Sequence, residues 1–305
     1  MSLNLPAGLD INYLIEDLRS VSWEASEILL FYSNQFRKEK AKNDLIKVKA
    51  NNEPVTLADL KVNELIIKRI SEKYQQVKWH LLSEENGIIK FNNKDINTNW
   101  LWVLDPLDGT RDFLQKTSDY ALHLALNYKN KPLIGIVLIP EREELWISNN
   151  KNVWCENKDG YKTKINLSER RELKNMKLVT SKNHKNQTLR NIIQTIGFKE
   201  SINMGSIGCK IASILRGESD IYISLSLPET SSPKDWDFAA PEALLKSAGG
   251  MITNLDNEEL IYNNHNFEQR GMIIASNNRD NHKNICKQIK LILKENKICI
   301  DKNIN

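Results

Sequence analysis

Cysteines and long apolar runs are both scarce in this 305-residue sequence. The four cysteines, Cys155, Cys209, Cys286 and Cys299, form neither a CxxC pair nor a paired framework, and a chain of this length does not need disulfides. No run reaches roughly 18 uninterrupted apolar residues, and the N-terminus carries acids where a signal peptide would be basic and then apolar. We therefore expect a soluble, cytoplasmic protein from a reducing compartment, without stable membrane insertion.

Charge of one sign is not gathered into a long block. The sequence has 43 basic and 39 acidic residues, a net charge of +4 and a pI of about 8.7, and both signs are spread widely. This distribution gives little support to nucleic-acid binding, so we expect no nucleic-acid polymer as a partner. The densest basic stretch, Arg37 to Ala50, is either a solvated helix end and loop or a rim that attracts an anionic substrate.

Hydrophobic periodicity predicts an α+β first half. Apolar residues recur at intervals of three and four from Ile11 to Tyr32, which predicts a long amphipathic helix, and a second helix is expected from Leu57 to Tyr74. The stretches VKWHLLSEE and WLWVLDP have the composition of strands that end in acids, and YALHLALNY, PLIGIVLIP, ELWISN and NVWCEN continue the strand pattern. The first half is therefore predicted to pack helices against an antiparallel sheet.

After about residue 168 strands and helices alternate. Helices are expected near 186–196, 207–215, 237–247 and 280–294, between strands that include KLVTS, SINM, DIYIS, MITNL and GMIIAS. Such alternation is typical of a layered α/β structure. We predict two packed subdomains, residues 1–168 and 169–305, which form one functional unit, with the polar stretch 156–175 as the closest thing to a linker.

Acidic residues stand at four predicted element boundaries: Asp59, Glu84-Glu85, Asp105 with Asp108, and Asp235 with Asp237. Each has a simple structural explanation. Asp59 and Asp237 could be acids of a first helical turn, Glu84-Glu85 a solvated strand end, and DPLDGT only a turn. None of the four clusters is decisive by itself.

Together, the acids have the pattern of a metal site. Carboxylates that arrive from several strand ends and helix starts are the ligands that Mg²⁺ requires. A water made more acidic by such an ion is a nucleophile for phosphate ester hydrolysis. Gly109 and Thr110 stand where a helix would begin, so their backbone N–H groups could face a phosphate.

Four segments carry a resemblance to a known family. EPVTLAD (53–59), SEE (83–85), WVLDPLDGTRDF (102–113) and KDWDFAAPEALLKSAGG (234–250) resemble, in order and spacing, the inositol monophosphatase superfamily. The resemblance extends from the first predicted helix to about residue 280. It implies a layered αβαβα sandwich of two packed subdomains and a lithium-sensitive phosphomonoesterase with two Mg²⁺ ions and room for a third, weaker one. Dimers are frequent in the family, so a homodimer is a further expectation.

The resemblance also implies a set of metal ligands. Glu84, Asp105 and the backbone carbonyl of Leu107 look like the first metal site. Asp105, Asp108 and Asp237 look like the ligands of the second, so Asp105 would bridge the two ions. Close placement of Asp105 and Asp108 then has a reason, because cations would lie between them.

Other positions resemble the catalytic and substrate-binding residues of the family. Asp59 and Thr110 match the pair that orients and deprotonates the attacking water, beside Glu84. The substrate phosphate would be held by Gly109 and Thr110. Asp108, Asp237 and Lys210 complete the expected substrate site, and Glu85 would lie behind the metal ligands.

Three details resemble the 3′(2′),5′-bisphosphate nucleotidase branch of this superfamily. They are Ser83 before the acid pair, Lys210 after a Gly-Ser stretch, and Lys234 two residues before Trp236. Lys210 or Lys234 could bind the second phosphate of 3′-phosphoadenosine 5′-phosphate; otherwise each is a solvated surface lysine. The branch implies a role in sulfur assimilation. An inositol monophosphatase, a sugar bisphosphatase and a catalytically silent phosphate-binding relative are the alternatives.

Two features depart from the family pattern. Pro241 follows WDFAA where glycine is common, so the helix is expected to begin nearer Pro241 than Asp237. The polar segment 224–234 resembles an insertion, and its Glu229 does not align with the substrate-binding glutamate of inositol phosphatases. Substrate choice is expected to depend on this segment.

Overall fold

Two β-sheets and seven helices organise the part of the chain that the computed structural model describes, which is residues 5–38, 46–48, 54–91, 98–182, 186–227, 230–298 and 300. The helices are α1 (Ile11–Lys38), α2 (Leu57–Lys73), α3 (Thr110–Leu114), α4 (Gln187–Ile196), α5 (Ile207–Leu215), α6 (Asp235–Ser247) and α7 (Arg279–Glu295). A short hairpin joins β1 (Ile46–Val48) to β2 (Pro54–Thr56) in addition to the two sheets.

The first sheet has eight strands in the order β10-β9-β8-β7-β6-β5-β3-β4. Its strands are β3 (His80–Ser83), β4 (Gly87–Lys90), β5 (Trp100–Asp108), β6 (Ala121–Tyr128), β7 (Lys131–Ile139), β8 (Glu144–Ser148), β9 (Val153–Glu156) and β10 (Lys162–Thr163). The predicted antiparallel sheet is correct except for one pair, because β3 and β5 run parallel. The hairpin partner β4 occupies the outer edge of β3, so β5 pairs with the other edge.

The second sheet has five strands in the order β12-β11-β13-β15-β14. They are β11 (Lys177–Ser181), β12 (Glu200–Met204), β13 (Ile221–Ser226), β14 (Met251–Asn254) and β15 (Gly271–Ser276). The strands β12, β11 and β13 are parallel to one another, and β15 runs antiparallel to both of its neighbours. The predicted α/β character of the second half is confirmed.

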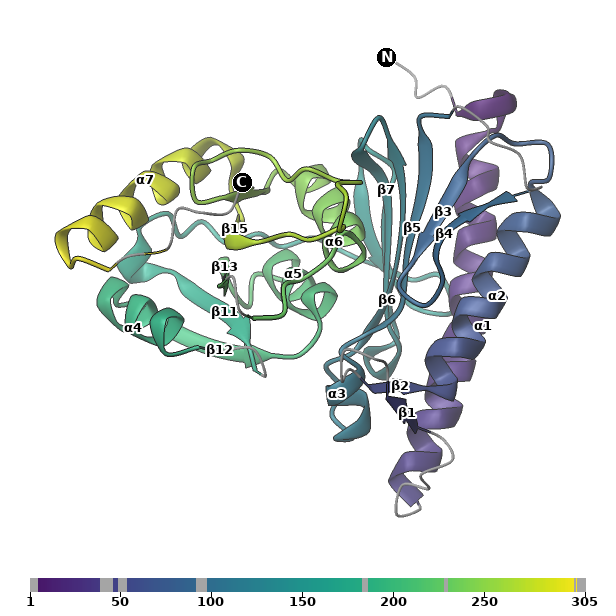
Figure 1. Cartoon of the computed structure of the whole chain (residues 1–305), viewed down its shortest axis with the longest axis horizontal. Helices are drawn as coiled ribbons and strands as arrows, with labels where there is room; N and C mark the ends of the chain where they lie inside the picture. Colours follow the sequence, from purple (N-terminus) through teal and green to yellow (C-terminus); the bar gives the residue numbers. More distant parts are fainter. Residues whose placement is uncertain are drawn as a thin grey trace.

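The two sheets and their helices form five layers. Helices α1 and α2 cover one face of the first sheet, α5 and α6 lie between the sheets, and α4 and α7 cover the far face of the second sheet (Figure 1). Alternation along β7 shows why: Ile134, Ile136 and Leu138 enter the core under α1 and α2, whereas Val137 and Ile139 face the middle helices. The predicted αβαβα sandwich is confirmed.

Helix α6 begins at Asp235, so the expectation of a start near Pro241 was wrong. The carboxylate of Asp237 accepts a hydrogen bond from the backbone N–H of Lys234 at 2.6 Å, which closes the first turn before the proline is reached. Pro241 lies inside the helix and removes only the bond to the carbonyl of Asp237. Helix α6 packs closely on β7 at this point, since a Cβ on Gly135 of β7 would lie 2.6 Å from the carbonyl oxygen of Ala240. This packing compensates for the lost hydrogen bond.

Helix α1 extends to Lys38, six residues beyond the predicted end at Tyr32. Most of the basic stretch from Arg37 to Ala50 lies outside the described residues, so neither interpretation of it is tested. Arg37 itself forms an ion pair with Glu141 at 2.6 Å.

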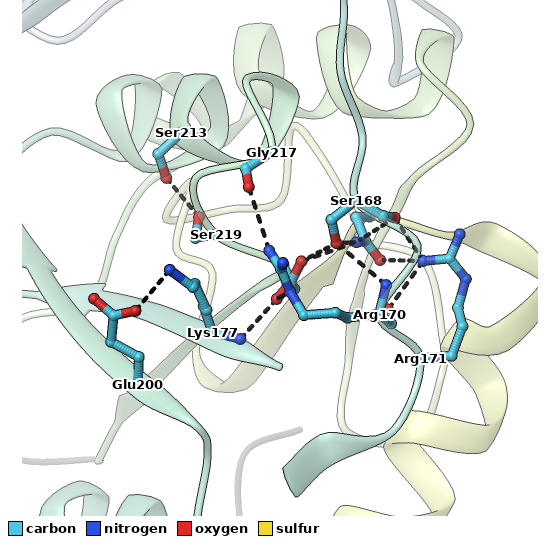
Figure 2. A network of polar contacts seen from close by, with 10 residues as sticks. Ser168, Arg170, Arg171, Lys177, Glu200, Ser213, Gly217 and Ser219 are labelled. Carbon is cyan, nitrogen blue, oxygen red and sulfur yellow. Dashed lines mark hydrogen bonds and ion pairs between the residues drawn. The ribbon is translucent and has the colours of Figure 1, made fainter. Parts of the chain in front are cut away.

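The polar stretch 156–175 is held to both sheets rather than loose. It contains β10, which pairs with β9, and its end is fixed on the buried carboxylate of Asp220. Arg170 Nε and the backbone N–H of Lys177 donate to Asp220 at 2.6 and 2.7 Å, and the Ser168 hydroxyl donates to its other oxygen (Figure 2). The subdomain boundary at residue 168 stays a prediction. Within the described residues, no helix has the length and apolar character needed to cross a membrane.

Candidate functional site

Three carboxylates from both halves of the chain meet at the C-terminal end of β5, an interior strand of the first sheet. Asp105 and Asp108 end β5, Asp237 lies in the first turn of α6, and one oxygen of each lies within 4.8 Å of the others. Glu84 follows β3 and lines the same cavity. Its position results from the parallel pairing of β3 and β5, because Ser83 stands opposite Leu104 and the next residues are Glu84 and Asp105.

A β-bulge explains how two aspartates three residues apart face the same site. Asp105 pairs with His123 and Asp108 with Ala121, so the three steps along β5 match only two along β6. In a regular strand, residues three apart point to opposite faces. The extra residue of the bulge reverses this alternation and brings both carboxylates together.

The close carboxylates repel one another in a buried environment. Asp105 is 1% exposed, and burial raises its pKa well above the usual value, with further contributions from the charges of Glu84, Asp108 and Asp237. The backbone N–H of Leu107 donates to Asp105 Oδ1 at 3.0 Å. A cluster of carboxylates that is buried at Asp105 and half-buried at Asp108 and Asp237, with a nearby backbone carbonyl, fits a hard divalent cation, which would compensate the repulsion.

Asp59 both caps helix α2 and faces a hydroxyl of the candidate site. Its Oδ2 accepts hydrogen bonds from the N–H and hydroxyl of Thr56, which caps α2, as the simple structural explanation requires. Its Oδ1 faces the hydroxyl of Thr110 at 3.4 Å, and that hydroxyl also donates to the carbonyl of Leu107 at 3.1 Å. Burial raises the pKa of Asp59 to about 7, although the hydrogen bonds from Thr56 oppose the shift.

Asp108 is fixed by the start of α5. Its Oδ2 accepts from the Ser206 hydroxyl at 2.7 Å and from the backbone N–H groups of Ile207 and Gly208. Negative charge is favoured at a helix N-terminus, so the second half of the chain holds this carboxylate of the first half in place. Gly109 follows with φ +92°, and a Cβ there would lie 2.7 Å from the carbonyl oxygen of Asp119.

The acids and three lysines, Lys182, Lys210 and Lys234, line one cavity of about 530 Å³. Lys210 is only 2% exposed, so the alternative of a solvated surface lysine was wrong. Its Nζ donates to the carbonyl of Gly205 and lies 5.6 Å from the centre of the Tyr222 ring. Burial lowers its pKa. Lys234 also lines the cavity and pairs with Glu268 at 2.9 Å.

Two predicted residues lie beside the cavity rather than in its wall. The Ser83 hydroxyl donates to Asn63 of α2 at 2.6 Å and accepts from the backbone N–H of Glu85 at 3.2 Å. Ser83 is fully buried, so it holds the end of β3 in position instead of contacting substrate. Glu85 acts on the site through charge, because it helps to raise the pKa of Asp59.

Sequence reasoning missed two residues of the site. Lys182 follows β11, lines the cavity and pairs with the buried Asp112 at 2.9 Å. Its position directly after a strand was a usable signal, by the same rule that singled out the acids. His123 is buried beneath Asp108, and burial lowers its pKa although the charge of Asp108 opposes the shift. Glu229 lies outside the described residues, whereas residues 230–234 line the cavity.

A model of the inositol monophosphatase family matches residues 11–294. The chain belongs to this family. Among curated relatives, the 3′(2′),5′-bisphosphate nucleotidase CysQ of Buchnera aphidicola subsp. Acyrthosiphon pisum is 32% identical over 219 residues, which are 71% of this chain and 77% of that protein. The Nus factor SuhB of Escherichia coli strain K12 is 29% identical over 237 residues, 76% of this chain and 80% of that protein.

A solved structure shows the same family fold. The extragenic suppressor protein suhB from Bartonella henselae superposes with a TM-score of 0.71 at 20% identity, covering 96% of this chain and 100% of that one. The predicted family is therefore confirmed, and CysQ relatives at 26 to 32% identity support the resemblance to the nucleotidase branch. As a member of the inositol monophosphatase family, the protein is a phosphoric monoester hydrolase.

Proposed function

We propose that this hydrolase is a Mg²⁺-dependent 3′(2′),5′-bisphosphate nucleotidase that removes the 3′-phosphate of 3′-phosphoadenosine 5′-phosphate. The observation that carries the proposal is the cavity itself, whose wall contains both the carboxylates and the buried Lys210. A bisphosphate needs both, because one phosphate is hydrolysed and the other must be held by cationic groups. The CysQ names of several relatives support the same substrate class.

The cluster of carboxylates would hold the metal ions. Asp105, Asp108 and Asp237 supply one oxygen each within 4.8 Å, and Glu84 and the Leu107 carbonyl complete the proposed ligands. Mg²⁺, when bound, supplies positive charge that makes water more acidic and stabilises phosphate oxygens. We propose two Mg²⁺ ions and a third, more weakly bound one. Millimolar lithium would inhibit the enzyme.

Asp59 and Thr110 would handle the proton of the attacking water. The Thr110 hydroxyl lies between Asp59 Oδ1 and the Leu107 carbonyl, so it can orient a water against the carboxylate. A pKa of about 7 lets Asp59 exist in the deprotonated form near neutral pH and still accept a proton. The capping hydrogen bonds from Thr56 keep its other oxygen from turning away.

Lys210 would meet the phosphate that is not hydrolysed. An ammonium group has three N–H donors, and the Gly205 carbonyl takes one of those of Lys210. Burial leaves little water to screen an ammonium charge at Lys210, although it also lowers the pKa of this group, and the charges of Asp108 and Asp237 oppose that shift. Lys182 and Lys234 line the same cavity and add positive charge to its wall. Such an enzyme would clear the by-product of sulfate activation during sulfur assimilation.

An inositol monophosphatase or sugar bisphosphatase is the second candidate. It is supported by the name of the family whose model matches the chain, inositol monophosphatase, and the same metal site would serve it. The catalytically silent alternative is disfavoured, because Asp59, Asp105, Asp108, Thr110 and Asp237 are all present.

The deciding measurement is phosphate release with Mg²⁺ from 3′-phosphoadenosine 5′-phosphate, adenosine 3′-monophosphate, inositol 1-phosphate and fructose 1,6-bisphosphate. We expect the highest kcat/KM for the bisphosphate nucleotide. Lys210→Met should raise KM for that substrate by about 10-fold or more and change adenosine 3′-monophosphate little. Lys158→Met, at a surface lysine that pairs with Glu27, is the control. A preference for inositol or sugar phosphates, or equal effects of Lys210→Met on both nucleotides, would contradict the proposal.

A further inference from the structure

Asp235 has no task in the proposed reaction, although it forms one acidic cluster with Asp237 in the sequence. It is the first residue of α6, two residues before Asp237, and it is only 1% exposed. Pro233, Lys234, Trp236 and Asp237 line the cavity, whereas Asp235 does not. Its carboxylate is therefore buried inside the protein rather than presented to an ion or a substrate.

The partners of Asp235 come from residues 261–269, a segment of the connection between β14 and β15. The backbone N–H of Asn263 donates to Asp235 Oδ2 at 2.6 Å, and Nε2 of Gln269 donates to Oδ1 at 2.7 Å. The backbone N–H of Asp235 donates to the carbonyl of Phe267 at 2.8 Å. Both carboxylate oxygens and the backbone N–H of Asp235 are thus bonded to the 261–269 segment, which satisfies a buried charge.

The 261–269 segment has a fixed conformation of its own. Nε2 of Gln269 also donates to the carbonyl of Ile261 at 2.9 Å, so the two ends of the segment are joined. Phe267 lies between them with φ +56°, a backbone conformation that bulky residues rarely adopt. Its ring centre lies 6.3 Å from that of Trp236, the cavity residue after Asp235. Such a conformation persists only where surrounding contacts hold it, and here those contacts are made with the start of α6.

The same segment also holds the residues just before the helix. The backbone N–H of Gln269 donates to the carbonyl of Pro233 at 2.8 Å, and Glu268 pairs with Lys234 at 2.9 Å. The backbone N–H of Lys234 in turn donates to the carboxylate of Asp237 at 2.6 Å. Polar contacts therefore lead without interruption from the 261–269 segment to a predicted metal ligand.

We infer that Asp235 is a positioning residue that anchors the first turn of α6 to the 261–269 segment and thereby sets the affinity of the metal site to which Asp237 belongs. This inference rests on the proposed function, because it requires that an ion binds there. Asp105 and Asp108 end a strand of the first sheet, whereas Asp237 lies on a helix of the second half, so the site depends on how that helix is held. Groups that support metal ligands typically change metal affinity by about 10-fold to 100-fold when they are substituted.

The test measures Mn²⁺ binding by calorimetry and by electron paramagnetic resonance, in the absence of substrate. Asp235→Ala removes both carboxylate bonds and should weaken binding by about 10-fold or more. Asp235→Asn should also weaken it, because an amide has only one oxygen and both partners of Asp235 are donors. Gln269→Glu should weaken it as well, because two buried carboxylates would then face each other.

The double variant Asp235→Asn with Gln269→Glu exchanges donor and acceptor, so the new amide can donate to the new carboxylate. It should bind Mn²⁺ more tightly than either single variant, which a loss of stability alone does not predict. The control is Asp220→Asn, since Asp220 is equally buried and accepts from Arg170 and Lys177 outside the cavity wall. This control should lower the thermal midpoint and leave the Mn²⁺ affinity at the wild-type value.

Wild-type Mn²⁺ affinity in Asp235→Ala would overturn the inference. An equal loss in Asp220→Asn would do the same, and so would a double variant that binds no better than its single substitutions. If Asp235→Ala does not fold, the comparison of the double variant with the two single variants decides the question. A wild-type protein that binds no Mn²⁺ would overturn both this inference and the proposed metal site. A wild-type protein that binds Mn²⁺ but releases no phosphate from the nucleotide would overturn the proposed substrate, while the metal affinities still decide the inference.

Discussion

Substitution of Asp59 by asparagine separates the structural role of this carboxylate from its proposed role as a base. An asparagine can keep the local hydrogen bonds, because its Oδ1 can accept both bonds from Thr56 while its amide nitrogen faces Thr110. The variant should therefore fold with α2 still capped. It can no longer accept a proton at neutral pH, and general bases of this kind typically contribute about 100-fold to 10,000-fold to kcat.

The raised pKa of Asp59 also predicts a change in stability with pH. Its pKa rises from 3.8 to about 7, because burial disfavours the charged form. A shift of roughly three units corresponds to about 4 kcal/mol. Since the pKa in the folded protein is higher than in the unfolded chain, this contribution is present below a pH of about 4 and is lost as the pH rises to about 7.

Urea unfolding between about pH 4 and pH 8, after a chelator has removed any metal ions, measures this contribution to the unfolding free energy. The difference in unfolding free energy between wild type and Asp59→Asn should change by about 4 kcal/mol in favour of the variant across this range. Asp256→Asn, at an exposed acid paired with Lys290, should show no such trend. A difference that stays constant with pH would refute the assigned pKa, and a normal kcat in the variant would refute the assigned base.

Three further predictions concern the same site. Asp108→Asn should lower kcat by orders of magnitude while the urea midpoint stays close to wild type, and near-normal turnover would remove Asp108 from the metal site. Gly109→Ala should destabilise the protein by about 1 to 3 kcal/mol and abolish turnover, because φ is +92° and the added Cβ would lie 2.7 Å from the Asp119 carbonyl; thermal unfolding and phosphate release measure the two effects. Lithium at millimolar concentration should inhibit phosphate release, and full activity would place the protein among insensitive relatives.

Local patterns in the sequence were sufficient for most of the fold. The sequence was sufficient to predict α1, α2, β6 and β7, because the apolar pattern of each element lies within one short segment of the chain. The start of α6 was not, because proline propensity competed with a cap and with packing of Ala240 on Gly135, a contact between residues far apart in the sequence. The parallel pairing of β3 with β5 depends on which side of β3 is left unpaired by β4, and no local sequence pattern predicts this.

The candidate site was also predicted only where local motifs were sufficient. The structure brings Asp105, Asp108, Thr110 and Asp237 into the wall of one cavity and places Asp59 behind Thr110, while their roles as ligands and base remain predictions. The burial of Lys210 was not foreseen, because the Tyr222 ring that covers it comes from β13, a strand of the second sheet. His123 was overlooked because a histidine inside an apolar strand gives no indication of which face it occupies or which oxygens it meets.

The position of α5 and α6 between the two sheets has a consequence for synthesis on the ribosome. Val103, Ala125 and Val137 lie on the face of the first sheet that these helices cover, and α6 ends only at Ser247. This apolar face must stay uncovered while much of the chain is still being translated, and exposed apolar surface promotes aggregation. Yield in a cell should therefore depend on how rapidly the second half emerges, and the first half expressed alone should require a chaperone to remain dispersed.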